Sequence, residues 1–137
     1  MTLLAEVARV SAAVAATASR LEKTRLLAEC LRVLEPSEVE IALPYLSGEI
    51  RQGKLALGYV ALKTAIGNAA PASGLSLRDV DSAFERLKAV KGKGAALLRR
   101  AELKNLFEKA TPQEQDFLLR LMVGELGQEV KKAAMAS

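Results

Sequence analysis

A glycine-bounded turn in the first half of the chain carries side chains well suited to hold a phosphate group. Its glycines are Gly48 and Gly53, with Arg51 and Gln52 between them and Lys54 directly after. Glycine lets a backbone approach a nucleic-acid strand closely, and the arginine fork donates several hydrogen bonds to phosphate oxygens. Gln52 could add a polar contact to a sugar or to a base edge in the minor groove. The same residues are also typical of a helix C-terminal cap that carries an exposed arginine and binds nothing.

A second loop, Lys91-Gly92-Lys93-Gly94, combines two lysines with two glycines. It is not a P-loop, because it lacks the five-residue approach from a first glycine, the hydroxyl residue after the lysine and a preceding strand. A basic loop that exposes backbone amides in front of a helix suits the backbone of a DNA strand better. We therefore predict phosphate contacts from both lysines, with the glycines giving a strand access to the backbone.

Positive charge is concentrated around these two segments. Residues 1–50 hold five basic and seven acidic side chains, residues 51–109 hold twelve and five, and residues 110–137 hold three and four. A phosphate-binding surface requires such a block, although a solvated helix face balanced by acids elsewhere has the same composition. Arg99 and Arg100, and Lys131 near the end of the chain, are candidates of second rank.

The commonest catalytic and metal-binding residues are scarce. The chain has no histidine, and its one cysteine, Cys30, has no partner for a disulfide or a metal site. Cys30 lies in step with Leu27, Leu31 and Leu34, so we expect a core thiol and not a nucleophile. The carboxylates fall at helix starts and on helix faces, where capping and dipole effects explain them. We therefore expect no catalysis and no bound metal or cofactor in this chain.

The composition predicts a single all-α domain. Of the 137 residues, 50% are hydrophobic and 26% are charged, with few aromatic or β-branched residues and abundant Ala, Leu, Glu, Lys and Arg. No apolar run is long enough to span a membrane, and Glu6 and Arg9 interrupt the region where a signal peptide would be apolar. We expect an intracellular protein of the cytoplasm and nucleoid with no membrane partner.

Caps and apolar spacings predict helices over about 3–16, 19–34, 36–46, 58–66, 76–90, 95–110 and 111–123. Four capping pairs are expected: Ser19 with Glu22, Ser37 with Glu40, Ser76 with Asp79, and Thr111 with Glu114. The side chains expected to face the core include Leu21, Leu27, Cys30, Leu31, Leu34, Val39, Ala42, Leu43, Leu46, Leu77, Val80, Phe84, Leu87, Val90, Leu97, Leu103, Leu106 and Phe107. Residues 67–74 read as the longest loop.

The sequence also contains a repeat. Residues 46–53 have a degraded copy in residues 122–129, and Pro36 meets Pro112 at the same offset of 76 positions. We predict a two-fold domain with halves at about 19–68 and 76–137 and a linker loop over 67–75. Gly127 and Glu129 replace the arginine and the glycine of the first turn, so the second turn should hold phosphate less firmly.

The turn L-S-G-E-I-R-Q-G, followed by Gly58-Tyr59 and by the loop of Lys91 and Lys93, resembles the N-terminal DNA-binding domain of ATP-dependent DNA ligases of the bacterial and archaeal kind. The resemblance implies an all-helical, internally two-fold domain that grips nicked duplex DNA through the minor groove without reading its sequence. It also implies that the catalytic nucleotidyltransferase and OB domains, which use ATP and Mg²⁺, are absent from this chain. No lysine here begins the K-x-D-G motif of those enzymes.

The residues best placed for DNA contact on this reading are Gly48, Arg51, Gln52, Gly53, Lys54, Lys91, Gly92, Lys93 and Gly94. The expected partners are duplex DNA and the catalytic domains of the same polypeptide, and the domain is expected to be a monomer. The residues leave open an alternative of another class. It is a helical protein-protein interaction module whose basic surface attracts an acidic partner.

Overall fold

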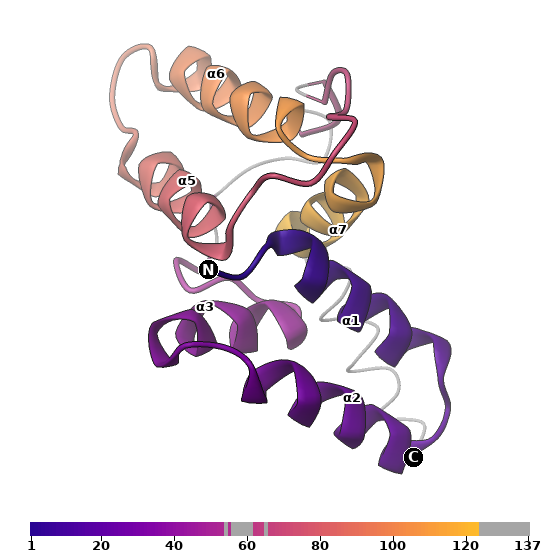
Figure 1. The fold of residues 1–137 in the computed structure, drawn as a ribbon. Helices are drawn as coiled ribbons and strands as arrows, with labels where there is room; N and C mark the ends of the chain where they lie inside the picture. Colours follow the sequence, from indigo (N-terminus) through magenta and orange to yellow (C-terminus); the bar gives the residue numbers. More distant parts are fainter. Residues whose placement is uncertain (54, 56–61, 65, 124–137) are drawn as a thin grey trace.

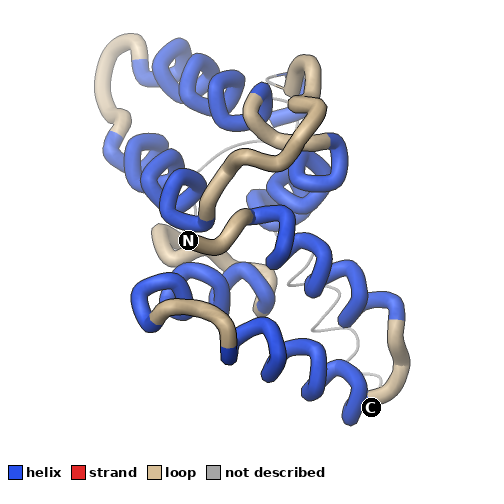
Figure 2. The backbone as a smooth tube through the Cα atoms, in the orientation of Figure 1, coloured by secondary structure: helices blue, strands red, loops and turns tan. Residues whose placement is uncertain are grey.

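The computed structural model describes residues 1–53, 55, 62–64 and 66–123. In that part the chain forms α1 (Leu4–Ala16), α2 (Arg20–Arg32), α3 (Pro36–Leu46), α5 (Leu77–Ala89), α6 (Ala95–Glu108) and α7 (Pro112–Val123), arranged as Figure 1 shows. Figure 2 shows helices and loops but no strand among these residues, which confirms the all-α prediction. None of the described helices is long and apolar enough to cross a lipid bilayer. Of the helix predicted over 58–66, residues 62–64 are helical, and most of the rest lies outside the described residues.

Side-chain caps start several helices where the sequence predicted them. The Ser76 hydroxyl accepts a hydrogen bond from the Asp79 amide at 3.1 Å, and the Asp79 carboxylate accepts one from the Ser76 amide at 3.1 Å. Thr111 and Glu114 form the same reciprocal pair, at 3.3 Å and 2.9 Å. Each pair satisfies two amides that a helix start leaves without an intrahelical partner.

The cap of α3 differs from the predicted Ser37 and Glu40 pair. The N-cap residue is Glu35, whose backbone amide donates to the Glu38 carboxylate at 3.1 Å. Ser37 instead accepts a hydrogen bond from Arg78 of α5 at 2.6 Å. Pro36 occupies the first helical position, so the cap must fall on the residue before it.

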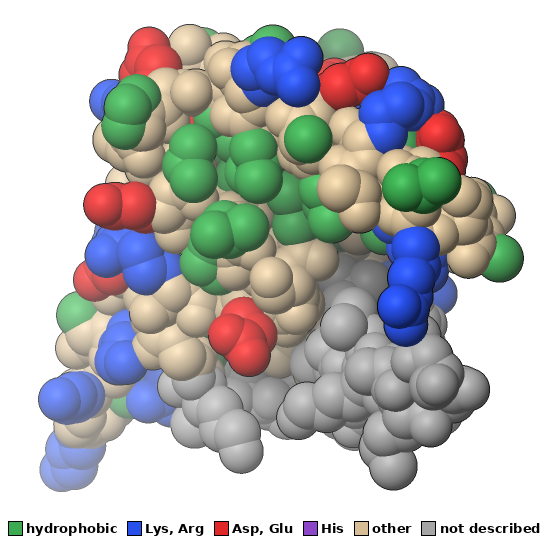
Figure 3. Space-filling model, turned by 90° about the horizontal axis from the view of Figure 1, so that it is seen from below, with side chains coloured by type: hydrophobic (Ala, Val, Ile, Leu, Met, Phe, Trp, Pro, Cys, Tyr) green, Lys and Arg blue, Asp and Glu red, His purple; other side chains and the backbone are tan. Residues whose placement is uncertain are grey.

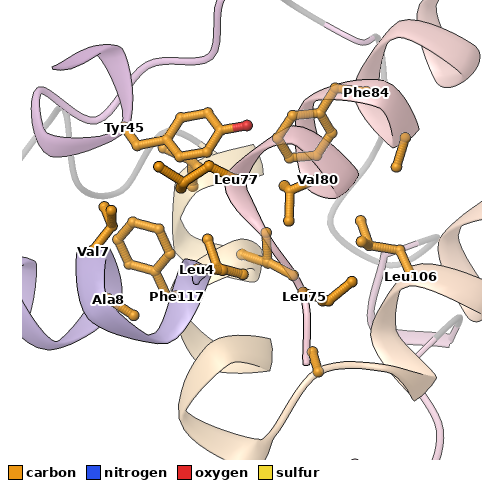
Figure 4. Packing of buried hydrophobic residues seen from close by; sticks show 14 of the residues in the cluster. Leu4, Val7, Ala8, Tyr45, Leu75, Leu77, Val80, Phe84, Leu106 and Phe117 are labelled. Atoms are coloured by element: carbon orange, nitrogen blue, oxygen red, sulfur yellow. The ribbon is translucent and has the colours of Figure 1, made fainter. Parts of the chain in front are cut away.

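One hydrophobic core joins the two halves of the chain. It contains buried residues of α1, α3, α5, α6 and α7, several of which are labelled in Figure 4. Tyr45 of α3 and Phe84 of α5 meet edge to face, with ring centroids 6.1 Å apart and ring planes at 76°. Aromatic pairs favour this geometry because the positive edge of one ring faces the negative face of the other. The predicted halves therefore share their core and are not separate packing units.

The residues before α1 add a short backbone link between the halves. The Leu4 amide donates to the Leu75 carbonyl at 2.9 Å, and the Leu77 amide donates to the Thr2 carbonyl at 2.9 Å. The Glu38 carboxylate accepts hydrogen bonds from the Thr2 amide at 2.6 Å and the Thr2 hydroxyl at 3.2 Å. This segment is therefore held by both α3 and the start of α5.

Three leucines predicted to face the core lie on the surface. Leu21 is 85% exposed and Leu97 is 74% exposed. Leu97 lies about 120° around α6 from the buried Leu103, because successive helical residues are about 100° apart. Leu21 lies at the opposite end of α2 from its buried residue, Cys30. In α3, Leu43 is exposed because the buried face runs through Ile41, Ala42 and Tyr45 instead.

The predicted repeat has local support in the described residues. The cap glutamates Glu38 and Glu114 lie 76 positions apart, and both are fully buried although glutamate is a polar residue. Cys30 and Leu106 are also both buried at this offset, and the burial of Cys30 confirms its place in the core. A two-fold relation between whole halves stays a prediction, because residues 124–129 of the second turn lie outside the described part of the chain.

Phe107 tests the assignment of the core. Phe107→Ala should lower the free energy of unfolding by about 3 to 5 kcal/mol, because it removes a fully buried ring. Leu97→Ala in the same helix should change it by about 0.5 kcal/mol or less, because this leucine is exposed. Urea unfolding of both variants measures the difference. Equal losses of stability would show that the inner face of α6 is misassigned.

Glu38 predicts an acid-sensitive contribution to stability. Burial alone would raise the pKa of Glu38, but hydrogen bonds from the Thr2 and Glu35 amides and the Thr2 hydroxyl hold its pKa below the ordinary value. A carboxylate with a lowered folded pKa stabilises the fold above its unfolded pKa, and this contribution disappears as the pH falls through the folded pKa. The free energy of unfolding should therefore fall as the pH drops below about 4.3.

Glu38→Gln should weaken this acid dependence, because glutamine does not ionise. Glu40→Gln on the exposed side of α3 is the matched control and should leave it unchanged. Urea unfolding between about pH 3 and about pH 7 compares the two variants with the wild type. The same pH dependence in Glu38→Gln and wild type would contradict the role given to Glu38.

Candidate nucleic-acid interface

The two glycine segments predicted from the sequence are both anchored to α5. The turn of residues 48–53 lies against one side of this helix, and the loop of residues 91–94 follows its C-terminal end (Figure 1). The Lys88 ammonium group donates a hydrogen bond to the backbone carbonyl oxygen of Gln52. Lys88 lies three positions before Lys91, so about one helical turn separates the contact from the loop. The structure therefore brings the two predicted segments to one helix.

The turn of residues 48–53 requires its two glycines. Gly48 has a φ of 81° and Gly53 a φ of 75°, a left-handed region that other residues adopt only with strain. The Gly48 amide donates to the Tyr45 carbonyl at 3.1 Å and the Gly53 amide to the Ile50 carbonyl at 3.0 Å. Gly48 thus ends α3, as a helix C-terminal glycine commonly does. It is buried, so unlike the exposed Gly53 it does not open the backbone to a DNA strand as predicted.

Arg51 is exposed in part, but its charge is already compensated. Its Nε and Nη2 atoms donate to the two carboxylate oxygens of Asp81 at 3.2 Å and 2.8 Å. Nη2 also donates to Glu85 at 3.1 Å. The hydrogen bond to Asp81 raises the pKa of Arg51 above its ordinary value, which keeps the guanidinium charged. The sequence predicted an arginine fork that donates to phosphate, whereas in the structure two carboxylates already hold its Nε and Nη2 atoms.

Gln52 occupies a different place from the one predicted. Its side chain is only 4% exposed, and its Nε2 atom donates to Asp81 at 2.7 Å and to Glu85 at 2.8 Å. A buried amide that is bonded to two carboxylates has no exposed group for a sugar or a base edge. We therefore remove Gln52 from the candidate DNA contacts and regard it as part of the support of the turn.

The loop of residues 91–94 keeps the properties that the sequence predicted. Gly92 and Gly94 have φ angles of 84° and 78°, and Lys91 and Lys93 are exposed. Neither lysine forms an ion pair with any residue that the structure describes. Gly94 is the N-cap of α6 and has no side chain to bond the first amides of the helix. The Ala95 amide already donates to the Gly92 carbonyl at 3.2 Å. The remaining amides of the first turn and the helix dipole favour an anion at such a helix start.

The other predicted DNA contacts are Arg99, Arg100, Lys54 and Lys131, and the structure describes only the two arginines. Arg99 donates to the Val90 carbonyl at 3.2 Å and is half-buried, so it supports the residue before the loop. Arg100 is exposed and has no ion pair within the described part of the chain. Lys54 and Lys131 lie outside the described residues.

The polar face of α5 was not predicted from the sequence. Asp81, Glu85 and Lys88 hold the turn, and their spacing of four and three positions puts them on one side of the helix. That spacing was a usable signal, because each carboxylate directly follows a core residue, Val80 or Phe84, and so lies about 100° round the helix from the apolar face. Their partners were not readable, since Arg51 lies 30 positions before Asp81.

Much of the basic block is compensated once the chain folds. Arg78 pairs with Glu35 at 3.0 Å and Arg86 with Glu102 at 2.6 Å, in addition to the pairs of Arg51. Among the described residues of the block, the basic side chains with neither an ion pair nor a hydrogen bond are Lys91, Lys93, Arg100 and Lys109. Lys88 and Arg99 bond only to backbone carbonyl oxygens. The uncompensated charge therefore lies at the end of α5, in the loop that follows and along α6. No cluster of metal-binding side chains occurs in the described residues.

Comparisons with known proteins identify the family of this chain. The profile of the family described as DNA ligase N terminus matches residues 52–136. A protein named probable DNA ligase from Anaeromyxobacter sp. (strain Fw109-5) is 44% identical over 127 residues, which are 91% of this chain and 24% of that protein. The probable DNA ligase of Nocardia farcinica is 42% identical over 134 residues, covering 98% of this chain and 26% of that protein.

The chain therefore spans about a quarter of the length of these curated relatives, since it covers 24% of one and 26% of the other. No solved structure matches the chain. The profile match covers more than half of the chain, and it includes both the end of the first glycine turn and the loop of Lys91 and Lys93. The chain belongs to the DNA ligase N terminus family.

Proposed function

We propose that this chain is the DNA-holding domain of an ATP-dependent DNA ligase. It binds duplex DNA beside a nick, from the minor-groove side and without reading the sequence. The catalytic domains of the parent polypeptide, which use ATP and Mg²⁺, then close around the ligation site. The family of the chain and its share of each relative support this division of labour. The domain acts as a monomer within the parent and supplies no catalytic group.

The proposal rests on two exposed lysines in the loop of residues 91–94. Lys91 and Lys93 are exposed and unpaired among the described residues, on a loop whose glycines open the backbone at the start of α6. Two free ammonium groups beside the amides of a helix start attract phosphate oxygens by charge and by hydrogen bonding. No base-reading side chain is needed for contacts of this kind, so binding is insensitive to sequence.

The turn of residues 48–53 contributes a second contact of a different kind. Arg51 keeps its Nη1 atom free of hydrogen bonds within the described part of the chain, while Nε and Nη2 are held by carboxylates. One guanidinium edge therefore remains for a phosphate. Its net attraction is smaller than that of Lys91 or Lys93, because Asp81 and Glu85 bring two negative charges beside it.

A second candidate function rests on the face opposite α5 and α6. Leu21 and Val33 are exposed at the two ends of α2. Figure 3 shows apolar side chains gathered in the middle of the face seen from below, with basic side chains mostly around its edge. Such a face suits a partner protein. Absence of DNA binding by the chain at low salt would favour this interaction module over the proposed DNA-holding domain.

The free lysines provide the test. Lys93→Ala and Lys91→Ala should each weaken binding to unrelated duplex sequences by similar factors. Each should also lower the slope of log K against log salt by about 0.9, since each removes one phosphate contact. Fluorescence anisotropy with a labelled duplex at three salt concentrations gives both quantities. Wild-type affinity should be in the range of non-specific binding, about 10⁻⁴ to 10⁻⁶ M at physiological salt.

Lys109→Ala is the matched control. Lys109 is also exposed and unpaired among the described residues, but it is the C-cap of α6 and lies about 21 Å along the helix from the loop. Its removal should leave the salt slope nearly unchanged. Equal effects of Lys93→Ala and Lys109→Ala would show that only diffuse charge attracts DNA and that the loop has no special place.

A further inference from the structure

Two carboxylates of α5 bind the same pair of side chains but differ in their surroundings. Asp81 and Glu85 lie one helical turn apart, and each accepts hydrogen bonds from Arg51 and Gln52. The side chain of Asp81 is only 13% exposed, whereas that of Glu85 is 54% exposed. The Asp81 carboxylate is therefore largely enclosed by the protein, whereas the Glu85 carboxylate is largely open to solvent.

Asp81 is the anchor of the turn. Its two oxygens accept from the Arg51 fork at 3.2 Å and 2.8 Å, and one of them also accepts from Gln52 at 2.7 Å. A carboxylate that receives parallel bonds from an arginine fixes the direction of the guanidinium as well as its position. The same carboxylate therefore orients both side chains that follow Ile50 in the turn.

The amide of Gln52 is oriented by these carboxylates. Reversing the amide would point its oxygen at two negative charges, so the Nε2 atom must face them. In this orientation the Gln52 Oε1 atom is buried without a hydrogen-bond partner among the described residues. An unpaired buried acceptor destabilises a fold. The fold tolerates the unpaired Oε1 atom because the Nε2 atom of the same side chain ties the turn to α5.

Glu85 acts in the opposite sense on any ligand of Arg51. It bonds Nη2 at 3.1 Å from the solvent side and adds a negative charge where a phosphate would approach. Like charges at such a distance repel each other, and the repulsion weakens the binding of an anion. Removing this charge leaves Arg51 still held by Asp81, because the hydrogen bonds to Asp81 do not involve Glu85.

We propose that Asp81 is a positioning residue that presents Arg51 to a phosphate of the DNA backbone, and that Glu85 competes with that phosphate for Arg51. This inference rests on the proposed DNA-holding function. It assigns opposite effects on DNA affinity to two carboxylates on the same face of one helix. General electrostatics alone assigns them the same effect, since the loss of either negative charge should favour DNA.

The test compares Asp81→Asn, Glu85→Gln and Glu29→Gln in the 137-residue chain. Glu29 on α2 is the matched control, because its side chain is 53% exposed and pairs with Arg25 at 2.8 Å, much as Glu85 pairs with Arg51. Anisotropy with a labelled duplex should show affinity raised by roughly two- to fivefold in Glu85→Gln and nearly unchanged in Glu29→Gln. Asp81→Asn should lower affinity by roughly tenfold.

Two further measurements separate positioning from a general loss of structure. Amide hydrogen exchange in residues 48–53 should become faster in Asp81→Asn, without DNA present, and should change much less in Glu85→Gln, whose amide oxygen can still accept a hydrogen bond from Gln52. In an Arg51→Ala background, Asp81→Asn should have little further effect on affinity, because Asp81 acts through Arg51. A merely structural role would lower affinity by the same factor in both backgrounds.

The inference fails if both α5 variants raise affinity, or if Asp81→Asn lowers it equally with and without Arg51. It also fails if Glu85→Gln raises affinity no more than Glu29→Gln. If the wild-type chain binds no DNA even at low salt, the proposed function is contradicted. In that case unchanged exchange in Asp81→Asn would overturn the anchoring role as well, and faster exchange would preserve that role alone.

Discussion

The contact between Tyr45 and Phe84 is the constraint on which the rest of the structure depends. It joins α3 of the first half to α5 of the second, with ring centroids 6.1 Å apart inside the common core. Because α3 is fixed against α5 here, the turn that follows α3 is placed beside the polar face of α5. The loop of residues 91–94 needs no further placement, since it directly follows α5. The aromatic contact thereby places the turn of residues 48–53 beside the same helix that the loop follows.

Compensation of charge shapes the surface as strongly as composition does. The middle of the sequence is rich in basic residues, yet folding gives Arg51, Arg78 and Arg86 carboxylate partners from other elements. The exposed pair of Arg78 and Glu35 contributes little stability, and all three pairs remove charge from part of the surface. Among the described residues of the block, the basic side chains without a carboxylate partner gather at the end of α5, in the loop that follows and along α6. Under the proposed function, the loop of Lys91 and Lys93 is therefore the part of the basic block where a phosphate strand is expected to bind.

Local signals predicted much of the fold, and contacts across the chain decided the rest. The caps of Ser76 and Thr111 were readable because both partners lie within three residues. Gly48 and Gly94 were predictable because Gly48 follows the end of α3 and Gly94 begins α6. The burial of Gln52 was not readable, since its partner Asp81 lies 29 positions away. The buried face of α3 was not predictable for another reason. Glu38 lies in the core, and a charged residue there breaks the apolar pattern that marks a buried helix face.

The central claim is that DNA lies against both glycine segments at once. An NMR titration of the isotopically labelled chain with a short duplex tests it most directly, because backbone amides report binding residue by residue. The account predicts the largest shifts at Gly92 and Gly94 and in the turn of Gly48 and Gly53, all at the same DNA concentration. Shifts confined to α1 and α2, with both glycine segments silent, would contradict it.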